Sequence, residues 1–261
     1  MLPSLWVAKT GLSAQDMNLT TISNNLANVS TTGFKRDRAE FEDLLYQVRR
    51  QPGGQSSQDS ELPSGLQLGT GVRIVGTQKI FTQGSLQTTE QPLDLAINGR
   101  GFFQILMPDG TISYTRDGSF QLNSDGQVVT SSGFPLEPAI VLPEQVRTFM
   151  VGEDGTVSVT VAGDPQPQVL GNIQTVDFIN YAGLEAIGNN LFLETAASGA
   201  PQAGMPGTNG LGNVLQNTLE NSNVSVVEEL VNMITTQRAY EMNSKVISTA
   251  DQMLSFITQK L

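Results

Sequence analysis

The chain has 261 residues, contains neither cysteine nor histidine, and carries 25 acidic against 14 basic side chains, which gives a formal net charge of −11. The absent residue types exclude thiol nucleophiles, histidine-based catalytic triads and zinc sites built from cysteine or histidine. The acidic balance argues against nucleic acid and against an anionic membrane surface as partners, because both attract a broad basic surface.

Residues 4–29 predict an amphipathic helix, because apolar side chains recur at steps of three and four residues. Gln15 breaks this stripe, whose members are Leu5, Ala8, Leu12, Leu19, Ile22, Leu26 and Val29. Trp6 lies just beside the stripe, where it either packs against a second helix or anchors a contact between copies. Polar residues from Lys9 onward interrupt the segment, and no run along the chain reaches membrane-span length. We therefore expect neither a cleaved Sec signal peptide nor membrane insertion.

The following segment has two parts. Residues 35–50 alternate in charge sign around a few apolar side chains, a pattern that leaves a short helix and an extended arm open. Residues 51–65 are polar and rich in glycine, serine and proline, which indicates a loop or linker. This segment is either a loose surface loop or a clamp on neighbouring copies of the chain, for which the candidate contact residues are Gln51, Pro52, Gly53, Leu62 and Pro63.

From residue 66 the apolar period changes to two, which predicts short strands. Such runs lie at residues 72–74, 93–97, 103–105, 128–129, 157–161 and 176–178. Asp-Gly pairs separate many of them and suit the positive φ angles of hairpin turns; they are Asp109-Gly110, Asp117-Gly118, Asp125-Gly126 and Asp154-Gly155. These patterns predict an antiparallel β domain over residues 71–196.

A second helix is predicted at the other end of the chain. The sequence Ser225-Val226-Val227-Glu228 is a capping box, which sets the helix start near residue 225. An apolar stripe follows, made of Leu230, Ile234, Ala239, Met242, Val246, Ala250, Met253 and Ile257. Two amphipathic helices need apolar surfaces to face, so we expect them to pair with each other, with copies of themselves, or both. The expected contact residues are Leu5, Leu12, Leu19, Ile22 and Leu26 against Ile234, Met242, Val246, Met253 and Ile257.

The expected fold class is α+β, mainly β, in which the terminal helices pair into a coiled-coil-like axial layer. Residues 1–34 and 222–261 form the helical domain, residues 35–70 and 197–221 an extended or linker region, and residues 71–196 the β domain.

The carboxylates are candidates for catalysis, since a glycosidase needs only two of them. Of Asp94, Asp109, Asp117 and Asp125, however, three precede glycine at predicted turns, where aspartate is expected for backbone reasons. Lys9-Thr10-Gly11 matches an element of penicillin-interacting enzymes, but no Ser-x-x-Lys supplies a nucleophile. We therefore expect a protein that is not an enzyme and that has no catalytic residue, metal site or cofactor.

Four long motifs resemble those of the bacterial flagellar rod and hook proteins, in the same order along the chain. Residues 24–36 (NNLANVSTTGFKR) resemble the N-terminal signature, residues 96–103 (AINGRGFF) and 114–120 (YTRDGSF) the central β motifs, and residues 237–245 (QRAYEMNSK) the C-terminal helix motif. Within this family, the chain is most similar to the distal-rod branch. The similarity lies in residues 41–47, 62–73 and 228–234 and in the chain length, since hook proteins are usually longer and carry an additional outer domain.

The resemblance implies a structural subunit that is exported unfolded through the flagellar type III apparatus. Such subunits polymerise into a hollow helical rod that crosses the periplasm, serves as an export channel and transmits torque from motor to hook. The implied partners are copies of itself, neighbouring rod and hook proteins, the surrounding ring proteins and the export apparatus. Two alternatives remain: another axial protein of the family, or a cell-wall glycan-binding protein whose helices only oligomerise it.

Overall fold

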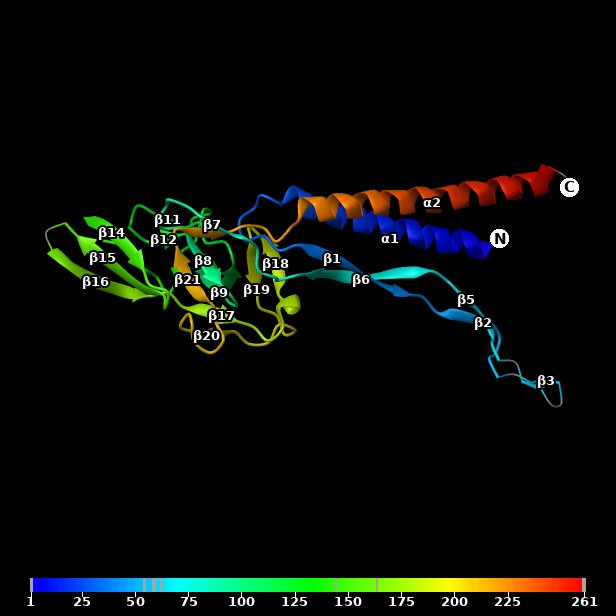
Figure 1. Ribbon diagram of the computed structural model, residues 1–261, viewed down its shortest axis with the longest axis horizontal. Coiled ribbons are helices and arrows are strands. Elements are labelled where there is room, and N and C mark those ends of the chain that lie inside the picture. The colour runs from blue at the N-terminus through cyan, green and yellow to red at the C-terminus, as the bar shows by residue number, and fades with distance from the viewer. Residues whose placement is uncertain are drawn as a thin grey trace. The chain divides into compact units, whose positions relative to one another are not determined.

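The computed structural model describes residues 2–53, 55–57, 60–61, 63–143, 145–162 and 164–259. The chain divides into two compact units. We call residues 1–26, 37–78 and 225–261 the helical unit, and residues 27–36 and 79–224 the β unit (Figure 1). Among the described residues, no helix is long and apolar enough to cross a membrane.

The helical unit contains two long helices, α1 (Leu2–Ala27) and α2 (Val226–Gln259). They lie side by side in Figure 1, and Asn18 Nδ2 of α1 donates a hydrogen bond to Thr236 Oγ1 of α2 over 3.1 Å. The start of α2 agrees with the predicted capping box. The predicted N-terminal helix is confirmed, with both of its ends two residues earlier than expected.

Three pairs of strands complete the helical unit and form an arm (Figure 1). β1 (Asp37–Asp43) pairs with β6 (Val72–Lys79), β2 (Tyr46–Arg50) with β5 (Leu66–Gly69), and β3 (Gln55–Ser57) with β4 (Ser60–Glu61). Residues 35–50, for which the sequence left a helix open, are therefore an extended arm. The predicted loop at residues 51–65 holds the outermost strand pair.

The β unit is built on a seven-stranded antiparallel sheet with the order β18-β19-β10-β9-β17-β20, in which β13 also pairs with β9. Its strands are β9 (Phe102–Leu106), β10 (Ile112–Thr115), β13 (Leu136–Glu137), β17 (Thr175–Asp177), β18 (Glu185–Gly188), β19 (Leu191–Leu193) and β20 (Gln202–Gly204). A short 3₁₀ helix, Tyr181–Gly183, precedes β18.

Smaller sheets surround this one. A three-stranded antiparallel sheet has the order β14 (Val146–Val151), β15 (Thr156–Val161), β16 (Asp164–Asn172). Three further pairs are β7 (Leu86–Thr88) with β22 (Thr218–Glu220), β8 (Leu95–Asn98) with β21 (Asn213–Gln216), and β11 (Gln121–Leu122) with β12 (Val128–Val129). Residues 197–221, expected to be an extended or linker region, thus contain three paired strands.

Two apolar cores hold the β unit together. Phe102 and Phe103 are successive residues of β9, so their side chains point to opposite faces of the sheet. Phe103 enters the larger core with Ile105, Leu136 and Val157, whereas Phe102 enters a smaller, aromatic core. The larger core joins the central sheet to β15. Every second residue of these strands enters a core, so the apolar period of two predicts this part of the fold.

The Asp-Gly turns follow the sequence prediction in three of four places. Gly110, Gly126 and Gly155 have φ angles between 74° and 83°, as hairpin turns require. Gly118 does not adopt a positive φ; instead, a Cβ atom there would lie 1.6 Å from the backbone oxygen of Leu95. Glycine is needed at this fourth position because another strand passes too close for any side chain.

Candidate assembly surface

Small and polar side chains set the register of the contact between α1 and α2. A Cβ atom placed on Gly11 would lie 3.1 Å from Asn243 Nδ2, and Asn18 hydrogen-bonds Thr236. From the first contact to the second, the position on α1 rises by seven residues, whereas the position on α2 falls by seven. The two helices therefore run antiparallel. We call this contact the α1–α2 seam.

The buried residues of α2 continue the seven-residue spacing of the seam. Glu229, Thr236 and Ala250 are buried, and Asn243 is partly buried. On α1 the most buried positions are likewise mainly small or polar: Ala8, Ala14, Thr21, Ile22 and Asn25. Asn25 exchanges two hydrogen bonds of 2.8 Å with the backbone of Asp37, which fixes the end of α1 to the start of the arm. The register of the seam therefore rests on small and polar residues of both helices.

The structure places the predicted contact residues in two different environments. Among those of α1, Ile22 is buried, and Leu5, Leu12, Leu19 and Leu26 are partly buried. Those of α2 are open to solvent: Ile234, Met242, Val246 and Met253 are between 48% and 64% exposed. The side chain of Ile257 lies outside the described residues. Within one chain, these four side chains of α2 are thus not covered.

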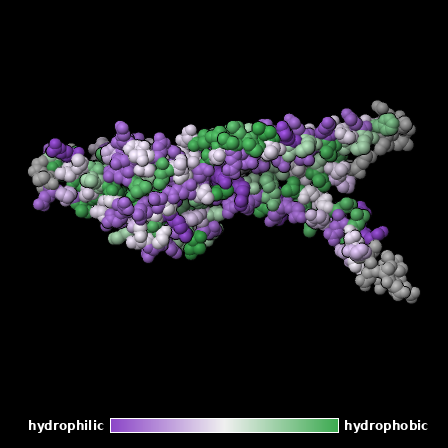
Figure 2. Space-filling model, in the orientation of Figure 1, coloured by the Kyte–Doolittle hydropathy of each residue, from purple (hydrophilic) through white to green (hydrophobic). Residues whose placement is uncertain are grey.

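A contiguous apolar surface covers the N-terminal part of α2 (Figure 2). Five side chains in the first three turns are between 42% and 73% exposed; they are Val226, Val227, Leu230, Val231 and Ile234. We call them the α2 patch. Trp6 on α1 is also exposed, which leaves it available as an anchor between copies. An apolar surface of this extent is typical of a site that another protein covers.

The arm carries further exposed apolar side chains. Leu45 is 88% exposed, and Tyr46, Val48, Leu66 and Leu68 are also open to solvent. Of the predicted clamp residues, Gln51, Pro52, Gly53 and Pro63 are exposed near the end of the arm, and Leu62 lies outside the described residues. A two-stranded ribbon with apolar residues on its surface is marginally stable alone and gains from packing on a neighbour.

Sequence reasoning missed a buried ionic network in the β unit. Lys35 Nζ lies 2.5 Å from Glu220 Oε1, and both side chains are 0% exposed. Glu220 Oε1 also accepts a hydrogen bond from the backbone N–H of Gly84 at 2.8 Å, and Arg116 Nη1 lies 3.6 Å from Glu220 Oε2. Burial lowers the pKa of Lys35, and the carboxylate of Glu220 partly offsets this effect. The partners are 185 residues apart in sequence, so no local pattern indicates the pair.

The same network explains two of the motifs. Gly33 has a φ of 68°, and a Cβ atom there would lie 2.7 Å from the backbone nitrogen of Asp117. Gly33 N–H donates to the carbonyl of Glu220 at 2.8 Å, directly beside the Lys35–Glu220 pair. The motif at residues 24–36 therefore meets the motif at residues 114–120, and both contact Glu220 at the end of β22. The Lys35–Glu220 pair is structural, because both groups are fully buried and paired with each other.

Comparison with known proteins gives matches at both ends and in the centre of the chain. Residues 5–35 match the family described as "Flagella basal body rod protein". Residues 96–159 match "Flagellar hook protein FlgE/F/G D1 domain", and residues 215–260 match "Flagellar basal body rod FlgEFG protein C-terminal". These three segments contain all four of the motifs; only residue 36, the last of the first motif, lies outside them.

Several relatives are similar over their full length. The FlgG flagellar basal-body rod protein of Buchnera aphidicola subsp. Schizaphis graminum is 58% identical over 259 residues, which cover 99% of this chain and 100% of that protein. The FlgG protein of Caulobacter vibrioides is 50% identical, with 99% of each chain covered. That of Bacillus subtilis is 37% identical, with 97% of each chain covered.

These matches, together with the fold and its exposed helix surface, define a structural axial protein of the bacterial flagellum and not an enzyme. The chain belongs to the family of flagellar basal-body rod proteins called FlgG, which confirms the resemblance seen in the sequence. It is a structural subunit of the distal rod in the basal body. Membership of the rod and hook family indicates that it assembles with copies of itself and with neighbouring rod and hook proteins.

Proposed function

We propose that the α2 patch and the stripe beyond it are the surface through which copies of this chain polymerise into a hollow helical rod. In this polymer, residues 1–34 and 222–261 form a coiled-coil-like axial layer around an export channel. Residues 71–196 form the outer β layer, and the resulting shaft transmits torque from motor to hook. The exposed apolar residues predicted on α2 then meet a neighbouring copy.

The main support is the contrast between the two faces of α2. One face makes a polar seam with α1, while the other exposes Leu230, Ile234, Met242, Val246 and Met253. Covering the exposed half of one such side chain contributes on the order of 1 kcal/mol, so five of them contribute on the order of 5 kcal/mol per contact. A patch that binds a different surface of the next copy repeats without closing, which produces a helical filament.

Substitution of one exposed residue tests this function. Leu230→Asp or Val246→Asp should prevent polymerisation, because a carboxylate would be buried in an apolar contact. Ser244→Asp is the matched control, since Ser244 is an exposed residue of the same helix outside the α2 patch and the stripe beyond it, and the change in charge is equal. Polymers are counted by electron microscopy, and near-ultraviolet circular dichroism of the aromatic core checks that the β unit is folded. Normal polymers of Leu230→Asp and Val246→Asp would contradict the proposal.

We also propose that the arm, including Gln51, Pro52, Gly53, Leu62 and Pro63, clamps neighbouring copies and stiffens the rod. The support is the exposed apolar ribbon formed by β2 and β5, which needs a surface to cover it. Deletion of residues 51–65 should shorten the persistence length of the polymer measured by electron microscopy. An unchanged bending stiffness would exclude the clamp.

We further propose that the chain reaches the periplasm through the flagellar export apparatus, without a cleaved Sec signal, and that the finished rod contacts the surrounding ring proteins. The polar interruptions of residues 4–29 support this route. Mass spectrometry of exported protein should find Leu5 and Trp6 still present in the chain. Loss of an N-terminal segment of about 20 residues, the length of a Sec signal, would contradict it.

A further inference from the structure

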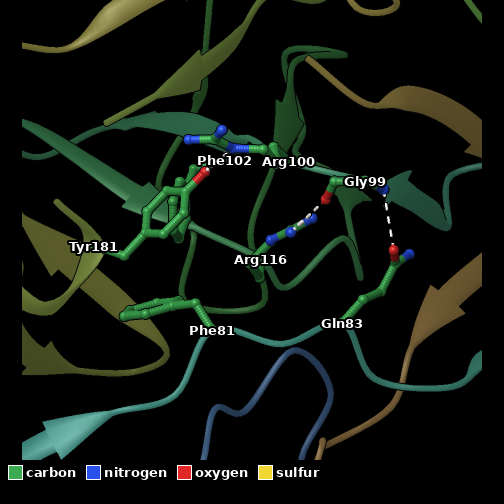
Figure 3. Close-up of a pocket in the computed structure, with 7 residues that line it drawn as sticks. All are labelled: Phe81, Gln83, Gly99, Arg100, Phe102, Arg116 and Tyr181. Carbon is green, nitrogen blue, oxygen red and sulfur yellow. Dashed lines mark hydrogen bonds between the residues drawn. The ribbon is translucent and has the colours of Figure 1, made fainter. Parts of the chain in front are cut away.

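The β unit contains a pocket that is lined by no residue of α1 or α2 (Figure 3). Its volume is about 210 Å³. Three aromatic rings form its apolar walls, those of Phe81, Phe102 and Tyr181, and their centroids are 5.6 Å apart in each pairing. Gln83 and Gly99 add polar groups, and the side chain of Gln83 accepts a hydrogen bond from the Gly99 N–H at 3.1 Å. The charged residues that line the pocket are both arginines, Arg100 and Arg116.

Arg100 is held in one orientation although its side chain is 60% exposed. Its Nε donates to Tyr181 Oη at 2.8 Å, its Nη2 lies 3.1 Å from Asp177 Oδ2, and its guanidinium stacks 5.5 Å from the Tyr181 ring centre. Figure 3 shows its guanidinium beside the Tyr181 hydroxyl. A surface arginine normally loses side-chain entropy when it binds a partner. Here much of that loss has already occurred on folding, which leaves a positioned cation open to solvent.

Arg116 supplies a second guanidinium, which is only 5% exposed. It donates to the backbone oxygens of Ile97 and Gly99 at 3.2 Å and 2.5 Å, and its Nε has no hydrogen-bond partner among the described residues. The ion pairs here form two groups, Lys35 and Arg116 with Glu220, and Arg100 with Asp177. The first group has one excess positive charge, in a chain whose net charge is −11.

We propose that this pocket binds a carboxylate, namely an exposed aspartate or glutamate side chain of a second copy of the chain. Guanidinium groups bind carboxylates through paired, charge-assisted hydrogen bonds, and the aromatic walls accommodate the methylene groups of the entering side chain. A volume of about 210 Å³ fits a single side chain. With 25 acidic against 14 basic residues, the second copy presents mainly carboxylates, so the charges are complementary. The pocket is thus a second contact between copies, and it rests on the proposed polymerisation.

Polymerisation of the full chain tests the contact. Arg100→Gln should raise the critical concentration for polymer formation, measured by light scattering, by about three- to tenfold, the effect of one charge-assisted contact. Arg147→Gln is the matched control, because Arg147 is an exposed arginine of the same unit and the charge change is identical. Tyr181→Phe, which removes the hydroxyl that orients Arg100, should act in the same direction with a smaller effect. Equal critical concentrations for Arg100→Gln and Arg147→Gln would overturn the proposal.

A direct binding measurement separates this contact from polymerisation itself. Acetate, titrated at constant ionic strength into dilute ¹⁵N-labelled protein, should shift the Gly99 amide and the Arg100 Nε–H resonances to saturation. Arg100→Gln should remove the saturable Gly99 shift, whereas Arg147→Gln should keep it. No saturable shift in the unsubstituted protein would overturn the carboxylate pocket. If that protein binds acetate but forms no polymer, the pocket stands as a carboxylate site and the proposed polymerisation fails.

Discussion

Removal of one partner from the buried ion pair of the β unit should destabilise that unit strongly. Lys35→Met deletes the ammonium that lies 2.5 Å from Glu220 and leaves the carboxylate buried. Glu220 keeps the hydrogen bond from Gly84 and the guanidinium of Arg116 at 3.6 Å, so its charge is not wholly uncompensated. The carbonyl of Thr82 also loses its bond from Lys35 but retains one from Asn223 Nδ2 at 3.2 Å.

The size of the loss follows from the charges that remain. Breaking a fully buried ion pair lowers the free energy of unfolding by about 3–5 kcal/mol. We expect a loss of about 3 kcal/mol for Lys35→Met, because Arg116 remains close to the carboxylate. Glu220→Gln should cost more, about 4–5 kcal/mol, because it leaves Lys35 and Arg116 buried without their shared anion. The double variant should lose less than the sum of the two, because the second substitution removes a charge that the first left unpaired.

Urea denaturation of the full chain measures these losses. Near-ultraviolet circular dichroism of the aromatic core, which includes the Tyr114–Phe178 ring contact, reports on the β unit. The far-ultraviolet helix signal reports on α1 and α2 and serves as the internal control. High salt should change little, because buried pairs are weakly screened. Losses below about 1 kcal/mol for both variants, or a smaller loss for Glu220→Gln than for Lys35→Met, would refute the assigned role of the pair.

Three further predictions concern backbone space, pH and dynamics. Gly118→Ala should prevent folding of the β unit, since its Cβ would lie 1.6 Å from Leu95 O, whereas Gly171→Ala, with no atom within 4 Å, should melt like the original protein. Burial, followed by the charge of Glu194, raises the pKa of Tyr114 from 10.0 to about 12. The folded chain therefore keeps this proton at a higher pH than the unfolded chain does. Stability should fall from about pH 10 toward about pH 12, and Tyr114→Phe should flatten that decline in urea titrations. In dilute protein, the amide hydrogens of α1 and α2 should exchange faster than those of β9 and β10, and polymerisation should slow the exchange in both helices. Slow exchange throughout both helices before polymerisation would contradict the proposal that assembly stabilises them.

The elements that a sequence pattern could predict are those in which burial follows a simple period. Both helices and the main strands were predictable because apolar residues recur at three and four, or at two, positions. The arm was left open between helix and extended chain because residues 35–50 are mostly charged, and charge alternation alone does not select a backbone. Gly118 was assigned to a hairpin turn from its Asp-Gly pair, but the approach of Leu95 is a tertiary contact that no dipeptide records.

The apolar stripes of the two helices were predictable from the sequence, but the residues that set the contact between α1 and α2 were not. These stripes predict that the helices pair with each other, with copies of themselves, or both. The seam instead uses Gly11, Asn18, Thr236 and Asn243, which give no hydrophobic signal and become meaningful only when the antiparallel register pairs them. The ionic network was missed for the same reason, since Lys35 and Glu220 become partners only in three dimensions.

A polar seam within the chain and an apolar face outside it suit a subunit that must assemble. If apolar residues joined α1 to α2 in each copy, little apolar surface would remain for neighbours, and polymerisation would have a weak driving force. Asparagine and threonine in a helix contact specify register at a cost in stability. The lone chain can thus fix which residues of α1 face which residues of α2, and in the proposed polymer neighbouring copies cover the exposed apolar residues of α2. The β unit does not need neighbouring copies for its stability, because its two apolar cores and the Lys35–Glu220 pair are complete within one chain.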